Sequence, residues 1–590
     1  MLYSRKNYKS TLFETMKKIL LIGIVVSLFS AVFFLRDILL HISEPLSTGD
    51  MAFSYFILQN DFEKIATLNF KDLFDTRMFY PQENTLALGN SMLPQAFLGL
   101  PFYLLTRDVI VCAHLMLFVT MFLSFLGMYL FAYSLTKHVY GSLFAGLLYT
   151  YNPYVFAHFP HHFELSTLQF IPFIFLFTER LIAKVNWTNV LTLSMLLLLQ
   201  LTSSVYYIFF LFVSLPVYFA LRVILEKRSF ALFFNTKLFV AAMLFILGAL
   251  FYLTPYIKGK DANGLSTPLE QIELLSFQLS DFLFTTPTNL LYGSLSQSSF
   301  AQAIRDPYVF VHFTEHAFFP GLVVITLCFL AIWYFVKRKF TPSDRKIVIT
   351  FLTLFVVAFI ISLGPYIHFG NMTLPLPYLF LYTFLPLVSG LSAPSRFMLI
   401  GLFSLFILCA FVIKYVTEKK KFGIFLILFL ALFTIVEYLQ KPLIPYVVKP
   451  ETKAFYEWLS NEKAKVIVEI PMANGFSEDL RKGRGFMSDS QYLLYGLYHN
   501  KKMVNGYNSF MPPQAALLGM SLVHFPARTH IERLRDLGVN IVVVHTDEYL
   551  EARDGEYVVS TLKKLGLKEI YASEFIHAFL VADEKREIKQ

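Results

Sequence analysis

The segment formed by residues 19–51 decides how the whole chain is interpreted. It begins with a mostly apolar run at residues 19–40, which is long enough to cross a bilayer as a helix. Ser47-Thr48-Gly49-Asp50-Met51 follows, so a single carboxylate lies ten residues beyond the end of the run. A Gly-Asp pair is also common in turns and at helix N-caps. Ionisable groups at a membrane edge are costly, however, and usually functional. We therefore predict that Asp50 is the central side chain of the protein.

The composition is typical of a polytopic membrane protein. Of the 590 residues, 56% are hydrophobic and 15% are charged, which is more apolar surface than a soluble domain can bury. The net charge of +9 comes from short basic clusters between apolar segments, as the positive-inside rule requires. We therefore do not expect nucleic-acid binding. Cys112, Cys328 and Cys409 all lie in apolar segments, a pattern that indicates neither a disulfide framework nor a metal motif.

Apolar segments and basic clusters together predict about eleven transmembrane helices. We expect the first to be an uncleaved anchor, because basic residues precede it and its apolar run is long. With eleven spans every basic cluster falls on the cytoplasmic side, together with the N-terminus. A shorter apolar segment at residues 93–105 contains two prolines and is predicted to lie at the outer surface or to re-enter it. The predicted spans are residues 19–40, 108–135, 141–157, a fourth ending at 182, 188–202, 205–225, 238–256, 317–336, 347–364, 398–416 and 422–439.

The predicted topology divides the chain into two domains. Residues 1–444 form the transmembrane domain, with external loops at 41–107, 257–316 and 365–397. From residue 445 to residue 590 the composition is that of a soluble protein, and helical segments alternate with β-branched strands. The predicted fold class is therefore an α-helical polytopic membrane protein with a C-terminal extracytoplasmic α/β domain. In that domain we expect helices at 452–460, 491–498, 528–537 and 557–565, and strands at 465–470, 539–545, 568–571 and 576–582.

Four groups of polar residues lie next to the outer ends of predicted spans, where they could converge on one cavity. The groups are Asp50; His158, His161 and His162 with Glu164; Glu315 with His316; and Arg396 within Ser392-Ala393-Pro394-Ser395-Arg396-Phe397. Each has a plainer reading. A Glu-His pair can cap a helix, Arg396 can reach lipid headgroups, and three histidines in five positions can bind a structural metal. The sequence has no P-loop, no HExxH motif and no nucleophile elbow, which excludes ATP-driven transport and protease chemistry.

These features resemble the GT-C superfamily of polytopic glycosyltransferases. That family places an acid just after the first span, where this chain has Asp50, and a second acid after a Gly- and Ala-rich helix that ends in proline. Here residues 146–153 lead to Glu164 in that place. A group of large bacterial GT-C-like membrane proteins is also similar to this chain in further segments. They are Met78-Phe79-Tyr80-Pro81, residues 151–169, Pro377-Tyr378 through Phe397, Val504-Asn505-Gly506-Tyr507 and Leu537-Gly538-Val539.

The resemblance implies an inverting, extracytoplasmic glycosyltransferase in the plasma membrane. It would move a sugar from a polyprenyl-phosphate donor to a cell-envelope acceptor, which could be a glycan, a lipid or a protein. Asp50 would be the general base, and Glu164, the second catalytic residue, would orient donor or acceptor. Arg396 would neutralise the leaving phosphate. The substrate-binding residues implied are His161, His162, Glu315, His316, Tyr378 and Arg396. The family's Asp-x-Asp pair is missing, so a divalent ion, Mg²⁺ or Mn²⁺, stays open without assigned ligands.

Two other functions also stay open. A transporter or flippase for lipid-linked glycans would need a polar pathway, and the predicted spans carry few internal charges. A catalytically silent GT-C-like scaffold would bind glycans or partner proteins through its outer domain, and the missing acidic pair favours that possibility. The Trp-Trp-Asp signature of oligosaccharyltransferases is also missing, which argues against peptide sequons as the acceptor.

Overall fold

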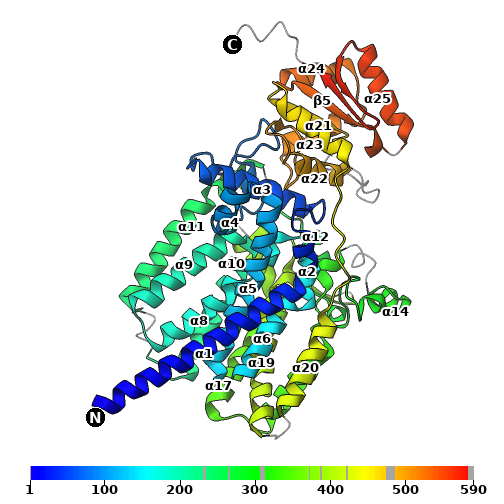
Figure 1. Ribbon diagram of the computed structural model, residues 1–590. Helices are drawn as coiled ribbons and strands as arrows, with labels where there is room; N and C mark the ends of the chain where they lie inside the picture. The colour runs from blue at the N-terminus through cyan, green and yellow to red at the C-terminus, as the bar shows by residue number, and fades with distance from the viewer. Residues whose placement is uncertain are drawn as a thin grey trace.

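The membrane part of the chain consists of helices in the places where the sequence predicts spans (Figure 1). The structure is a computed structural model that describes residues 2–581 except 230–233, 264–265, 306–311, 371, 386–387, 420–422, 473–484 and 550. Seven helical stretches in this part of the chain are long and apolar enough to cross a membrane. They coincide with or overlap α1 (Leu2–Phe34), α5 (Val109–Thr136), α8 (Phe170–Ala183), α10 (Val205–Leu225), α11 (Thr236–Asn263), α17 (Pro342–Ser362) and α19 (Met398–Lys419).

Shorter helices occupy the other four predicted spans. They are α6 (Val139–Tyr151), continued by α7 (Pro153–His158), and α9 (Trp187–Ser203), α16 (Leu322–Val336) and α20 (Gly423–Tyr438). The number of spans predicted, about eleven, therefore agrees with the helices. The first predicted span is completed by α2 (Arg36–Leu40), and the short apolar segment predicted at the outer surface is α4 (Leu93–Thr106). Helix α4 packs against α3 (Asp50–Ala66) and α5 at the end of the bundle that carries the C-terminal domain.

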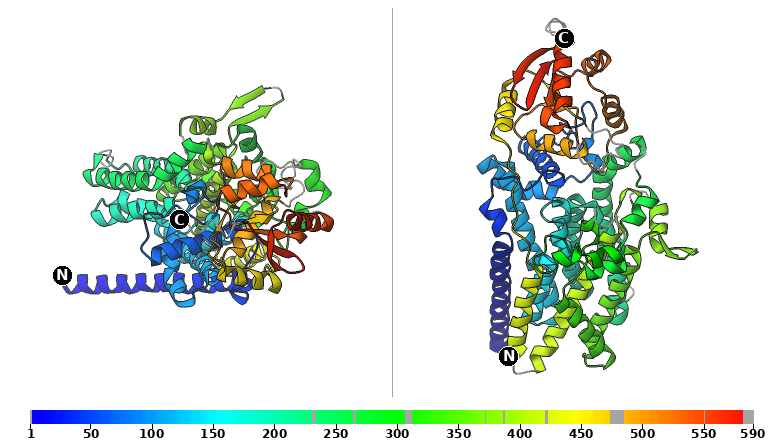
Figure 2. Two further views of the ribbon diagram at one scale, coloured as in Figure 1. Left: turned by 90° about the horizontal axis from the view of Figure 1, so that it is seen from above. Right: turned by 90° about the vertical axis from the view of Figure 1, so that its right-hand side faces the viewer.

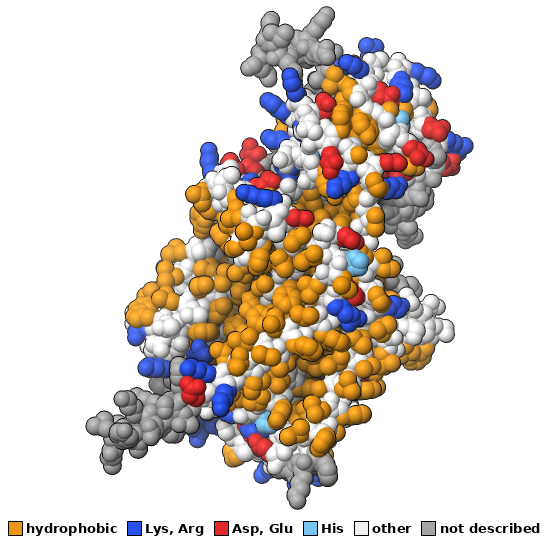
Figure 3. Space-filling view, viewed as in Figure 1, with side chains coloured by type: hydrophobic (Ala, Val, Ile, Leu, Met, Phe, Trp, Pro, Cys, Tyr) orange, Lys and Arg blue, Asp and Glu red, His pale blue; other side chains and the backbone are white. Residues whose placement is uncertain are grey.

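The surface of the bundle fits a bilayer. Apolar side chains cover its middle, and charged side chains gather at both ends (Figure 3). Exposed Phe29 and Val25 on α1 and Phe429 on α20 belong to this belt. Helix α19 lies inside, in contact with α6, α16 and α17, and its Phe403 and Phe406 are fully buried. Because helices satisfy their own backbone hydrogen bonds, such a bundle can cross hydrocarbon. The protein is a multi-pass membrane protein.

Short helices and one hairpin join the membrane helices on the side that the sequence predicts to be external. These elements are η1 (Thr85–Leu88), η2 (Phe163–Ser166), α12 (Leu269–Leu274), η4 (Leu279–Leu283), α13 (Gly293–Ser296), α14 (Ser299–Ile304), η5 (Phe313–His316), the antiparallel pair β1 (Tyr366–Phe369) and β2 (Met372–Pro375), α18 (Pro377–Phe384), η6 (Val388–Gly390) and η7 (Pro394–Phe397). The C-terminal domain and the N-terminus lie at opposite ends of the bundle (Figure 2). The sequence predicts apolar chain broken by prolines at 365–397 and misses the hairpin, because its two four-residue strands show no alternation of buried and exposed positions.

The C-terminal domain is built on a five-stranded mixed sheet with the order β4-β3-β5-β7-β6. Its parallel strands β3 and β5 are fully buried, as their continuous runs of valine and isoleucine predict. The strands are β3 (Val466–Ile470), β4 (Lys502–Met503), β5 (Ile541–His545), β6 (Lys568–Ala572) and β7 (Ile576–Leu580); the helices are α21 (Pro450–Asn461), α22 (Gly485–Tyr495), α23 (Pro513–Ser521), α24 (Arg528–Asp536), η9 (Thr546–Glu548) and α25 (Ala552–Lys564). The predicted α/β fold is confirmed.

Three details of this domain differ from the sequence prediction. Helix α22 begins six residues earlier than predicted and ends at Tyr495 instead of residue 498, because Gly496 follows and glycine favours the end of a helix. Strand β4 and helix α23 are not predicted at all. Strand β4 has only two residues, too few to show a periodic pattern. The boundary at residue 445 stays a prediction.

The first external loop is joined to the C-terminal domain by backbone hydrogen bonds. Met503 N donates to Arg77 O (2.7 Å), Tyr80 N donates to Met503 O (2.9 Å), and Phe79 N donates to Asn505 O (3.0 Å). Gly506 follows, and a Cβ atom at this position would lie only 2.6 Å from the Phe79 ring. The loop and the domain therefore meet in close contact, with no room for a side chain at Gly506.

We expect Gly506→Ala to destabilise the protein, since an added methyl group must push the Phe79 ring out of place. Such overpacking costs about 1–3 kcal/mol, which thermal unfolding in detergent would show as a lower midpoint. Gly259→Ala in α11 is the matched control, because a Cβ there meets no atom within 4 Å and alanine favours a helix. Equal midpoints for the two variants would contradict the close contact at Gly506.

Candidate active site

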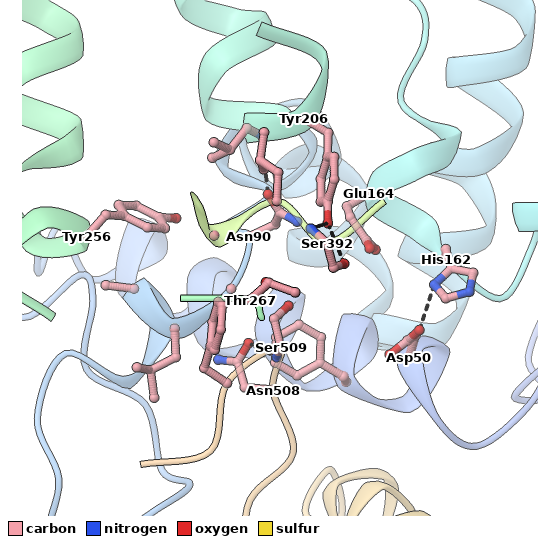
Figure 4. Close-up of a pocket in the computed structure, with 18 of the residues that line it drawn as sticks. Asp50, Asn90, His162, Glu164, Tyr206, Tyr256, Thr267, Ser392, Asn508 and Ser509 are labelled. Carbon is pink, nitrogen blue, oxygen red and sulfur yellow. Dashed lines mark hydrogen bonds and ion pairs between the residues drawn. The ribbon is translucent and has the colours of Figure 1, made fainter. Parts of the chain in front are cut away.

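A cavity of about 890 Å³ opens where the membrane helices meet the C-terminal domain. Its lining comes from segments far apart in the sequence, which the fold brings to one place (Figure 4). The polar and aromatic side chains that line it are Asp50, Phe53, Asn90, His162, Glu164, Tyr206, Tyr256, Ser266, Thr267, Gln271, Ser392, Arg396, Tyr507, Asn508, Ser509 and Phe510. Loops at span ends, α3 and the C-terminal domain therefore all contribute to one site.

Asp50 is held on both sides by hydrogen bonds. It is the first residue of α3, after Gly49, whose φ of 73° is a conformation that suits glycine. Its Oδ2 lies 2.6 Å from Nδ1 of His162, and its Oδ1 accepts a 2.7 Å hydrogen bond from the Tyr507 hydroxyl. A carboxylate in the first turn also suits the positive end of the helix dipole. Asp50 is thus oriented by the loop before α8 and by the C-terminal domain together.

The surroundings of Asp50 and His162 favour their charged forms. Burial alone would raise the pKa of Asp50 and lower the pKa of His162. Their mutual attraction and hydrogen bond outweigh burial, so the pKa of Asp50 falls below its ordinary value of 3.8 and the pKa of His162 rises to about 9. The Tyr507 hydrogen bond lowers the pKa of Asp50 further. At neutral pH the pair is a carboxylate and an imidazolium.

Arg396 forms the second charged group of the cavity. Its Nε donates to Glu315 Oε2 (2.8 Å) and its Nη2 donates to Glu315 Oε1 (2.6 Å), which is a bidentate pair. The guanidinium also lies over the Tyr206 ring, 4.4 Å from its centroid. Burial would raise the pKa of Glu315, but Arg396 and the nearby His158 hold it well below its ordinary value. Arg396 therefore has one fixed position, with Glu315 on the side away from the cavity lining.

His158 lies between the two charged pairs. Its Nδ1 bonds Tyr154 O (3.0 Å), its Nε2 lies 3.5 Å from Glu315 Oε1, and its ring centroid is 5.5 Å from that of His162. His158 is the last residue of α7, His162 ends the turn that follows, and Glu164 lies in η2. This segment connects the Asp50 side of the cavity to the Arg396 side.

Four of the site residues predicted from the sequence line the cavity, and four do not. Asp50, His162, Glu164 and Arg396 line it, while Glu315 contacts it only through Arg396. His161 bonds the Ser47 hydroxyl (3.0 Å) outside the lining. His316 and Tyr378 are buried elsewhere: His316 Nδ1 lies 3.0 Å from Asp281 Oδ2, and the Tyr378 hydroxyl donates to Leu391 O (3.1 Å). These contacts hold the loops together, and neither side chain lines the cavity.

The sequence analysis gave no role to three tyrosines that line the site, Tyr206, Tyr256 and Tyr507. Tyr206 stands at the start of α10, where its hydroxyl accepts a hydrogen bond from Ser392 N (3.1 Å). Tyr507 lies in the segment Val504-Asn505-Gly506-Tyr507, so the resemblance pointed to its neighbourhood without giving it a role.

The structure is similar to solved structures of membrane glycosyltransferases. Its alignment with the arabinofuranosyltransferase AftD from Mycobacteria has 12% identity and a TM-score of 0.54, and it covers 96% of this chain but only 40% of AftD. ArnT from Cupriavidus metallidurans aligns over 97% of this chain and 98% of its own length, with 11% identity and a TM-score of 0.49. The oligosaccharyltransferase AglB from Archaeoglobus fulgidus aligns over 90% and 69%, with 10% identity and a TM-score of 0.47.

The chain has a GT-C-like fold. The match to AftD carries this conclusion, and it confirms the fold that the sequence resemblance implies. No protein-family model matches the chain, and no curated protein sequence does. In this GT-C-like protein the cavity lies between the helical bundle and the C-terminal domain.

The donors around the cavity fit a divalent ion poorly. In the described part of the chain no three His, Cys, Asp or Glu side chains are grouped closely enough to hold a metal ion. Both oxygens of Asp50 already have hydrogen-bond partners, and one of these is a cationic imidazole. A cation bound to the Asp50 carboxylate would have to displace His162, so we give Mg²⁺ or Mn²⁺ no role at this acid.

We expect the Asp50–His162 pair to stabilise the protein only within a pH window. Because the pKa of His162 is raised on folding, its contribution is fully present below its ordinary pKa of 6.5 and is lost as pH rises through about 9. The lowered pKa of Asp50 gives a contribution that is present above 3.8 and lost as pH falls below that value. The midpoint of thermal unfolding should therefore differ between wild type and His162→Gln near neutral pH.

That difference should shrink between about pH 7 and about pH 10. His524→Gln, a change at an exposed histidine outside the cavity, should show no such trend. A midpoint difference for His162→Gln that stays constant over this range would contradict the assignment of an imidazolium next to Asp50.

Proposed function

We propose that this protein is an inverting, extracytoplasmic glycosyltransferase. It moves a sugar from a polyprenyl-phosphate donor to a cell-envelope acceptor. The observation that carries the proposal is one cavity that contains an ionised carboxylate, Asp50, and a fixed guanidinium, Arg396. The GT-C-like fold supports this reaction class, since AftD, which shares the fold, is an arabinofuranosyltransferase. The positive-inside rule supports a cytoplasmic N-terminus and an extracytoplasmic C-terminal domain.

Arg396 is suited to hold the phosphate of the donor. Its Nε and Nη2 are engaged by Glu315, but its Nη1 makes no hydrogen bond to the described residues. That nitrogen can donate to a phosphate oxygen while Glu315 and the Tyr206 ring keep the guanidinium in place. Charge-assisted hydrogen bonds of this kind are stronger than neutral ones, and they favour the negative charge that develops on the leaving phosphate.

Asp50 is suited to accept the proton of the acceptor. In the proposed step the acceptor hydroxyl oxygen attacks the anomeric carbon and forms the new C–O bond. The bond from that carbon to the bridging phosphate oxygen breaks, and the phosphate leaves with the electron pair. The hydroxyl proton passes to the carboxylate of Asp50. His162 keeps this carboxylate ionised and oriented, and Glu164, on the wall of the same cavity, orients donor or acceptor.

Asp50→Asn should reduce sugar transfer by about 10²- to 10⁴-fold, the usual contribution of a general base. The amide is similar in shape to the carboxylate but cannot accept the proton. Transfer is measured in membranes supplied with a panel of labelled polyprenyl-phosphate sugars and envelope extract. Glu83→Gln, an exposed acid in the same external loop and outside the cavity, is the matched control and should keep wild-type activity.

This experiment tests the role of Asp50 and the transferase activity separately. If Asp50→Asn still transfers sugar, the proposed role of Asp50 is wrong, but the protein is still a glycosyltransferase. A wild-type protein that binds these lipids yet transfers no sugar from any donor would contradict the proposed function. It would favour the silent GT-C-like scaffold in its place.

A further inference from the structure

The C-terminal domain supplies a side chain directly to the central acid of the cavity. The Tyr507 hydroxyl donates a 2.7 Å hydrogen bond to Asp50 Oδ1, although the two residues are 457 positions apart in the chain. The Tyr507 ring also packs near the Phe53 ring of α3, with 6.2 Å between the centroids. The contact therefore joins α3, near the N-terminus, to the C-terminal domain.

The segment that carries Tyr507 is anchored on its N-terminal side inside the C-terminal domain. Asn505, which is fully buried, accepts a hydrogen bond from Glu469 N (2.7 Å) and donates to Glu469 O (2.9 Å) and to Asp489 Oδ1 (3.0 Å). The two bonds to Glu469 tie the segment to strand β3, and the bond to Asp489 ties it to α22. Asn505 O in turn accepts from Phe79 N (3.0 Å) in the first external loop.

On the other side of Tyr507 the same segment is anchored to the membrane domain. Asn508 Nδ2 donates to Thr85 O (2.9 Å), and Gly89 packs so closely that a Cβ there would lie 2.0 Å from Asn508 Oδ1. Tyr507 is thus flanked by two buried asparagines, one held by the C-terminal domain and one by the first external loop. Its hydroxyl has little freedom to leave Asp50.

We propose that Tyr507 is a positioning residue that fixes the carboxylate of Asp50 for proton transfer. This inference rests on the proposed function. His162 holds one carboxylate oxygen and Tyr507 holds the other, so the two partners together prevent rotation of the carboxylate about its Cβ–Cγ bond. Because Tyr507 belongs to the C-terminal domain, the acid is fully oriented only when that domain is docked on the first external loop.

Loss of the Tyr507 hydroxyl should change both the orientation and the ionisation of Asp50. A hydrogen bond to the charged form of an acid lowers its pKa, and Tyr507 contributes to the lowered pKa of Asp50. Without it the pKa of Asp50 rises, and a larger fraction of the acid is protonated at any given low pH. Since only the carboxylate can accept the proton, activity is then lost at a higher pH as the solution is acidified.

The test compares Tyr507→Phe with Tyr446→Phe in the full-length protein. Tyr446 is the matched control, because its hydroxyl lies 3.3 Å from that of Tyr495 and it does not line the cavity. For Tyr507→Phe we expect kcat to fall by about ten- to a hundredfold, as is typical when a hydrogen bond to a charged group is lost. We expect KM for the donor to change less than about twofold, because the phosphate contact at Arg396 is kept. The acid limb of the pH–rate profile should move to higher pH.

A wild-type pH–rate profile in Tyr507→Phe would overturn the inference, even if kcat fell through general destabilisation. A second measurement does not depend on transferase activity. The difference in unfolding midpoint between a protein and its Asp50→Asn counterpart reports the ionisation of Asp50 as pH falls. This difference should vanish at a higher pH in the Tyr507→Phe background than in wild type. If the midpoint differences follow the same curve against pH in both backgrounds, the inference is overturned, even if the protein transfers no sugar. If the two curves are separated but the wild-type protein is inactive, only the proposed function is contradicted.

Discussion

The hydrogen-bonded ion pair between Asp50 and His162 is the interaction on which the rest of the site depends. A carboxylate at the edge of a membrane loses much of its hydration, and an isolated one would become protonated. An imidazolium at 2.6 Å and a tyrosine hydroxyl at 2.7 Å replace the lost water. Each partner comes from a different part of the chain, so the assembled fold supplies both of the groups that keep the acid ionised in the cavity.

The same principle applies on the opposite side of the cavity. Arg396 is buried beside Glu315, and a bidentate pair with an aromatic platform at Tyr206 offsets the cost of burying its charge. His158, at the end of α7, and His162, in the turn that follows, connect this pair to Asp50. The result is a cavity in which two opposite charges are fixed before any substrate arrives. Charges that are fixed in advance in this way can stabilise the charge that develops in a transition state.

The sequence predicts the bundle well, because span length and basic clusters are set by the bilayer. It also predicts four cavity residues, since Asp50, His162, Glu164 and Arg396 all stand at outer ends of spans. The same reasoning could not tell that His316 is enclosed by its own loop beside Asp281. It could not show that Tyr507 contacts Asp50, because a contact across 457 residues leaves no local pattern. The periodicity of apolar residues along the sequence indicates which positions are buried. The tertiary fold decides which side chains meet across the cavity.

The most direct test of the central claim is a cryo-EM structure of the Asp50→Asn variant with a polyprenyl-phosphate sugar bound. We predict phosphate density within hydrogen-bond distance of Arg396 Nη1. The sugar should lie between that phosphate and residue 50, with its anomeric carbon open to attack from the side of residue 50. Density for the donor headgroup outside this cavity, or a cavity that stays empty at saturating donor, would contradict the account.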